Sequence, residues 1–74
     1  REVQMHEFQD WIFSARGRTI TARVQVDGRG GGTITRFEVR PGPSQIGLSI
    51  KVGSQQEAAA ELERILTGLL GADW

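Results

Sequence analysis

The 74-residue chain contains no cysteine, no tyrosine and a single histidine, and it has no long apolar run. Without cysteine, the chain can form neither a disulfide nor a thiolate metal site. No apolar stretch approaches the roughly 20 residues that a membrane-spanning helix needs, so we expect a soluble chain and assign it by default to the cytoplasm. Because so short a chain can bury only a small core, we expect one domain, residues 1–74, that associates with a protein partner or a second copy.

Residue types suited to catalysis are equally scarce. Acid–base and nucleophilic catalysis need a base close to the reacting group, and the one histidine, His6, lies near the N-terminus. The spacing of His6, Asp27 and Glu38 matches no metal-ligand pattern. The glycine-rich run at 28–32 differs from a phosphate-binding loop, because a strand rather than a helix is expected after it. The sequence therefore predicts a protein that is not an enzyme and has no cofactor, no metal site and no small-molecule substrate.

Charge is balanced in total but not along the chain. Nine Lys and Arg residues offset nine Asp and Glu residues, which argues against a polycation. Residues 11–53 nevertheless carry seven cations and two anions, a net charge of +5, whereas residues 1–10 and 54–74 are both negative. The central part of the chain is therefore the part best suited to bind a polyanion.

Apolar and polar residues alternate in four segments, which is the pattern of strands with one buried face. A frayed segment, 1–8, is expected to precede four strands at about 9–15, 18–26, 33–40 and 45–52. In the third strand, strict alternation turns Thr35, Phe37 and Val39 inward and Ile34 outward. Glycine and proline mark the connections before and after this strand.

Residues 55–70 are predicted to form an amphipathic helix. Ser54 and Glu57 match a capping box at its start, and Gly71 stands where a C-terminal cap belongs. The apolar stripe of the helix consists of Ala58, Leu62, Ile65, Leu66 and Leu69. Because this stripe and the inward faces of the strands both need an apolar partner, the sequence predicts an α+β domain. We expect a four-stranded, mainly antiparallel sheet followed by one C-terminal helix packed on one face.

The sheet face that the helix leaves uncovered is expected to carry most of the cations. Alternation and loop position bring together six of them: Arg23, Arg36, Arg40 and Lys51 on the face, and Arg18 and Arg29 in neighbouring loops. Such a face suits nucleic-acid phosphates, but it has none of the aromatic side chains on which single strands stack. It can equally be the solvated face of an antiparallel sheet.

A second indication of function comes from apolar residues that are expected to be exposed. Ile12 and Ile34 are both expected to point outward, and an exposed apolar pair can mark a surface for a protein partner. The edge strands offer another route, by pairing with a strand of another chain. Together with the balanced charge, these features favour a small non-enzymatic protein-interaction or assembly module that self-associates or docks onto a larger protein. The alternative is a nucleic-acid-binding module that uses the cationic face.

Overall fold

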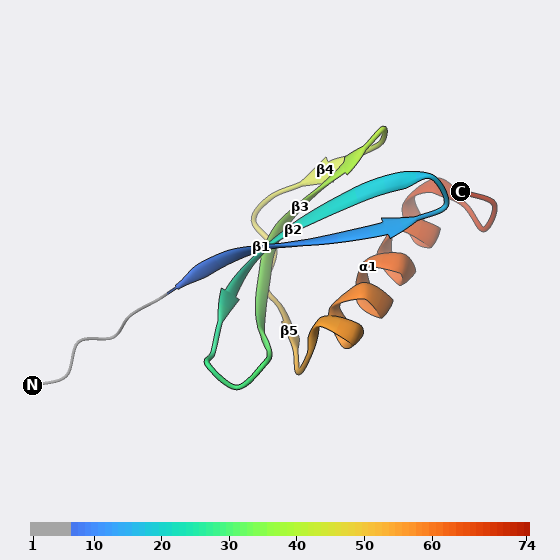
Figure 1. Ribbon diagram of the computed structural model, residues 1–74. Coiled ribbons are helices and arrows are strands. Elements are labelled where there is room, and N and C mark those ends of the chain that lie inside the picture. Colours follow the sequence, from blue (N-terminus) through green and yellow to red (C-terminus); the bar gives the residue numbers. More distant parts are fainter. Residues whose placement is uncertain (1–6) are drawn as a thin grey trace, which may run out of the picture.

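A sheet followed by one helix makes up the computed structural model, which describes residues 7–74 (Figure 1). The elements are β1 (Phe8–Ala15), β2 (Arg18–Val26), β3 (Gly32–Arg40), β4 (Ser44–Gln45), β5 (Ile50–Val52) and α1 (Gln55–Leu70). The predicted α+β arrangement is confirmed. His6 and most of the segment expected to be frayed lie outside the described residues, whereas Phe8 already belongs to β1.

The sheet is antiparallel throughout. Strands β1, β2, β3 and β4 follow one another in space, and β5 pairs with the other end of β3. Arg16 and Gly17 join β1 to β2 in a two-residue turn in which both have positive φ, 54° and 75°. Such a turn has the twist that a tight hairpin requires. This connectivity leaves β1, eight residues long, at the edge of the sheet.

A β-bulge in β3 changes which side chains reach the core. Arg23 lies opposite Arg36, but the next residue of β2, Val24, lies opposite Ile34, so Thr35 is the extra residue. The Thr35 hydroxyl donates a hydrogen bond of 3.2 Å to the carbonyl oxygen of Arg23. Strict alternation does not hold across a bulge. Ile34 is therefore fully buried, and the prediction that it points outward is wrong.

The fourth predicted strand is divided into β4 and β5. Both pair with β3, but the four residues between them, 46–49, stand opposite only two residues of that strand. Gly47 in this segment has a φ of 72°, which an extended strand does not adopt. The continuous strand predicted at 45–52 is therefore wrong, and Ile46 is 78% exposed.

Helix α1 spans the residues expected for it and is capped at both ends. The Ser54 hydroxyl accepts a hydrogen bond of 3.1 Å from the Glu57 amide. The Glu57 carboxylate accepts one of 2.7 Å from the Gly53 amide, one residue before the cap. At the other end, Gly71 has a φ of 95° and its amide donates to the Thr67 carbonyl at 2.9 Å. The buried side chains of the helix are Ala58, Leu62 and Leu66, whereas Leu69, which was predicted to belong to the same apolar stripe, is 47% exposed.

The core extends beyond the helix to Trp74, which is 8% exposed. Its indole Nε1 donates to the Thr67 hydroxyl at 2.9 Å. The Arg16 guanidinium lies 4.6 Å from the centre of the Trp74 ring and donates to the Ala72 carbonyl at 2.9 Å. The β1–β2 turn and residues 72–74 therefore hold each other against the core.

Candidate interaction surface

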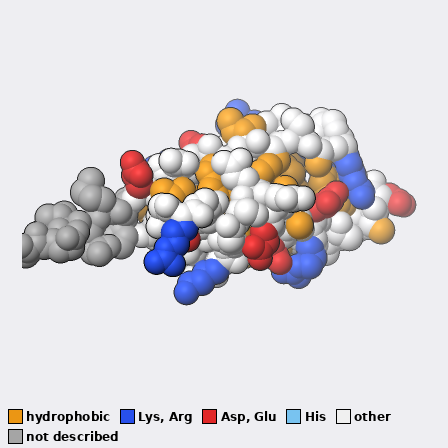
Figure 2. Space-filling view, turned by 60° about the horizontal axis from the view of Figure 1, so that its bottom comes forward, with side chains coloured by type: hydrophobic (Ala, Val, Ile, Leu, Met, Phe, Trp, Pro, Cys, Tyr) orange, Lys and Arg blue, Asp and Glu red, His pale blue; other side chains and the backbone are white. Residues whose placement is uncertain are grey.

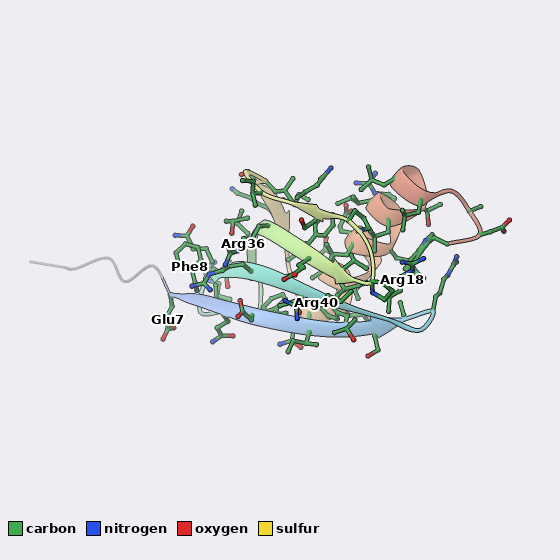
Figure 3. All side chains as sticks on the ribbon, turned by 90° about the horizontal axis from the view of Figure 1, so that it is seen from above. Glu7, Phe8, Arg18, Arg36 and Arg40 are labelled. Atoms are coloured by element: carbon green, nitrogen blue, oxygen red, sulfur yellow. The ribbon has the colours of Figure 1, made fainter. Side chains whose placement is uncertain are left out.

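The sheet face opposite α1, called the outer face below, combines polar, cationic and apolar side chains. The strand register places the following residues on it: Phe8, Asp10, Ile12 and Ser14 of β1, Thr19, Thr21, Arg23 and Gln25 of β2, Thr33, Arg36, Glu38 and Arg40 of β3, and Lys51 of β5. In the view of Figure 3, Phe8 and Arg36 lie toward the end of the sheet where β1 begins, and Arg18 lies toward the opposite end. The register places all four predicted cations on this face: Arg23 lies opposite Arg36, whereas Arg40 and Lys51 lie toward opposite ends of β3.

Neighbouring carboxylates neutralise two of these four cations. Arg23 forms an ion pair with Asp10 at 3.6 Å, and Arg40 forms one with Glu38 at 2.9 Å. Four cations and two anions leave the outer face with a net charge of about +2, well below the +5 of residues 11–53. Exposed ion pairs contribute little to stability, but they reduce the attraction of the face for a polyanion.

Phe8 also lies on the outer face, so the prediction that this face has no aromatic side chain is wrong. It is 44% exposed, and the Arg23 guanidinium lies 5.4 Å from its ring centre, within the range of a cation–π contact. The alternation along β1 could have placed Phe8 on this face, because Phe8, Asp10 and Ile12 are two positions apart and such residues share one face of a strand.

A shallow hollow of about 280 Å³ lies on the outer face between the strands and the segment after β4. Two cations, Arg23 and Arg36, and two anions, Asp10 and Glu38, contribute to its lining, and the exposed Ile46 lies beside them. The opposing charges cancel, so the hollow favours neither anionic nor cationic ligands. Within residues 7–74, no group of acidic or histidine side chains is placed to hold a metal ion.

The loop cations predicted for partner contact lie in different settings. The Arg18 guanidinium donates to the Pro41 carbonyl, so Arg18 ties the end of β3 to the start of β2. Arg29 is exposed at the tip of the β2–β3 hairpin, where its amide donates to the Asp27 carboxylate at 2.8 Å. The register of the sheet therefore joins neither of them to the four cations of the outer face.

The predicted apolar pair is not a pair on the surface. Ile12 is 67% exposed on the outer face, whereas Ile34 is buried in the core. Ile12 instead has Phe8 as its exposed apolar companion on the same strand. Phe8 and Ile12 are thus the exposed large apolar side chains of β1, and Ile46, Leu69 and Leu70 are exposed elsewhere on the surface.

The open edge of β1 is the longest unpaired strand edge within the described part of the chain. On the other side of the sheet, β3 is covered by β4 and β5, which are two and three residues long. Proteins commonly protect sheet edges with short strands, bulges, proline or inward charges. Strand β1 contains no proline, its register is unbroken, and Asp10 is its one charged residue. The backbone N–H and C=O groups at the open edge of β1 are therefore accessible for hydrogen bonding to a strand of another chain.

The face seen in Figure 2 carries basic and acidic side chains interspersed, with apolar side chains between them. No large area of one charge sign dominates that view. Among residues 7–74, no helix is long and apolar enough to cross a bilayer.

Comparisons of the chain with protein-family models, with curated proteins and with solved structures found no match. The functional assignment therefore depends on the geometry and chemistry of the chain itself.

Proposed function

We propose that this domain is a non-enzymatic protein-interaction or assembly module that associates through β1. The observation that carries the proposal is an eight-residue edge strand with an open backbone and exposed apolar side chains at Phe8 and Ile12. A strand added to such an edge gains a row of main-chain hydrogen bonds, and the side chains beside it provide specificity. The partner is a second copy of the chain or an extended segment of a larger protein.

The small core supports the same proposal. A domain of this size buries a smaller fraction of its surface than larger domains do, and chains without disulfides or metals commonly gain stability by association. Pairing along β1 would give hydrogen-bond partners to the backbone groups that point away from β2 and would cover Ile12.

Replacing Ile12 with lysine tests the proposal. We expect the variant to fold and its association to weaken by at least about tenfold, because a charge replaces an apolar side chain in the cross-strand contact. The matched control is Ile46→Lys, since Ile46 is also exposed but lies outside β1. Sedimentation equilibrium across the micromolar range measures the association of wild type and both variants.

Two results would contradict the proposal. One is a wild-type protein that stays monomeric at high micromolar concentration and binds no protein partner. The other is an Ile12→Lys variant that associates as strongly as the wild type.

A second candidate function is nucleic-acid binding, which the exposed Phe8 beside Arg23 favours. An aromatic ring next to a guanidinium is an arrangement that stacks on nucleobases. The ion pairs of Arg23 and Arg40 with carboxylates argue against it. Binding of a single-stranded oligonucleotide that falls steeply with salt, without self-association, would favour this candidate over the first.

A further inference from the structure

We infer that the partner of β1 is a second copy of this chain, and that two copies form a symmetric antiparallel β1–β1 pair with Ile12 opposite Ile12 of the second copy. This inference rests on the proposed function and specifies its partner and its register. Three observations carry it: the direction of the free backbone groups, the charge pattern along β1, and the partial burial of Phe13 beside the open edge.

The ladder with β2 determines which backbone groups of β1 are free. The Glu7 carbonyl accepts a hydrogen bond of 2.9 Å from the Val26 amide. Hydrogen-bonded and non-hydrogen-bonded pairs alternate along an antiparallel ladder. The N–H and C=O groups of every second residue therefore face away from β2 toward the open edge, namely those of Phe8, Asp10, Ile12 and Ser14.

The charge of Asp10 favours one of the possible symmetric registers of the β1–β1 pair over the others. A pairing centred on Asp10 would place two carboxylates opposite each other, which destabilises a sheet. A pairing centred on Trp11 would place Asp10 opposite Ile12, so the second copy would give the carboxylate an apolar neighbour and no hydrogen-bond donor in addition to its ion pair with Arg23. A pairing centred on Ile12 places Asp10 opposite Ser14 twice, so that each hydroxyl can donate to a carboxylate of the other copy. This register also joins the two exposed Ile12 side chains.

The inner face of β1 fits the same register. Trp11 is buried, but Phe13 is only partly buried where the sheet ends. With Ile12 at the centre, Trp11 of each copy stands opposite Phe13 of the other, so both aromatic side chains gain apolar neighbours. The two-fold axis runs perpendicular to the joined sheet, and both copies of α1 therefore lie on the same side of it.

Single cysteines test the register, because the chain has none of its own. Residues in a hydrogen-bonded antiparallel pair have Cα atoms about 5.5 Å apart, which lies within the range of a disulfide. We expect Ile12→Cys to form a disulfide-linked dimer under mild oxidation at least about tenfold faster than the collision background, because pairing raises the local thiol concentration. Ile12 is exposed, so the variant keeps the fold.

Two matched variants define that background. Ser14→Cys lies on the same strand and face, but in this register its two copies are displaced by about 13 Å along the strands and cannot be linked. Ile46→Cys is equally accessible and lies outside β1. Both are expected to cross-link slowly and at the same rate.

The results of these experiments distinguish a wrong register from a wrong proposed function. Background cross-linking of Ile12→Cys, while wild-type protein still self-associates in sedimentation, would overturn the register and leave an interaction module that pairs along β1 in another register or uses another surface. A wild-type protein that is monomeric at high micromolar concentration would overturn the dimer as well. Binding of β1 only to a different protein would overturn the dimer and retain the proposed function.

Discussion

Replacing Ile34 with alanine is expected to lower the free energy of unfolding by about 2–5 kcal/mol, because the change leaves a cavity in the core. The matched change Ile12→Ala is expected to alter it by less than about 0.5 kcal/mol, as is usual for exposed positions. Strict alternation gives the two residues the same outward orientation. The bulge at Thr35 separates them, so that Ile34 is fully buried and Ile12 is 67% exposed.

Urea unfolding followed by circular dichroism measures both changes. The experiment is done at low protein concentration, since association through β1 would itself stabilise the folded chain. Equal effects of Ile34→Ala and Ile12→Ala would contradict the bulge and the core that it creates. For a chain of this size, the expected loss at Ile34 is a large fraction of the total stability.

Replacing Trp74 with alanine is expected to lower the free energy of unfolding by about 3 kcal/mol, the lower part of the range for large aromatic residues. The indole is 8% exposed, its Nε1 donates to the Thr67 hydroxyl, and the Arg16 guanidinium lies over the ring. The substitution removes the buried ring, this hydrogen bond and the contact with the β1–β2 turn together.

Trp74→Phe is the milder comparison. It keeps one aromatic ring for the core and for Arg16 but removes the indole N–H and the second ring, so we expect a loss of about 1–2 kcal/mol, smaller than that of Trp74→Ala. Thermal and urea unfolding of the two variants measure both losses. A loss below about 1 kcal/mol for Trp74→Ala, where a buried aromatic side chain usually costs 3 or more, would show that residues 72–74 do not hold the turn.

The helix was predictable from sequence because its signals are local. The Ser54 hydroxyl, the Glu57 carboxylate and Gly71 act on backbone groups within four residues of them. The apolar stripe between the caps has the spacing of one helical face. The attachment of Trp74 was not predictable, since it depends on Arg16, which is distant in sequence and reaches it only when the sheet and helix are assembled.

The strands were predicted less accurately than the helix, because uniform alternation of apolar and polar residues does not reveal a bulge or a break. The first three were predicted to within about one residue, because each has one buried face. The bulge was missed, although the apolar residues Ile34 and Phe37 stand three positions apart and that spacing is incompatible with uniform alternation. The division of the fourth strand depends on Gly47, whose positive φ breaks an otherwise regular pattern.

The cations of the outer face were predicted from the sequence, but the ion pair that neutralises Arg23 was not. Alternation placed Arg23, Arg36, Arg40 and Lys51 on the outer face, and the register confirms those positions. The neutralisation of Arg23 was hidden, because the Asp10–Arg23 contact depends on the β1–β2 register. The open edge of β1 was equally hidden, since sequence does not specify which strand lies at the edge.

Amide hydrogen exchange along β1 tests most directly whether its open edge is the association surface. The amides of Trp11 and Phe13 bond to β2 and are expected to exchange slowly at every protein concentration. The amides of Asp10, Ile12 and Ser14 are expected to exchange rapidly in dilute solution and to become protected as concentration rises or as the partner is added. If these three amides exchange rapidly under all conditions in which the protein associates, the association surface is not the edge of β1.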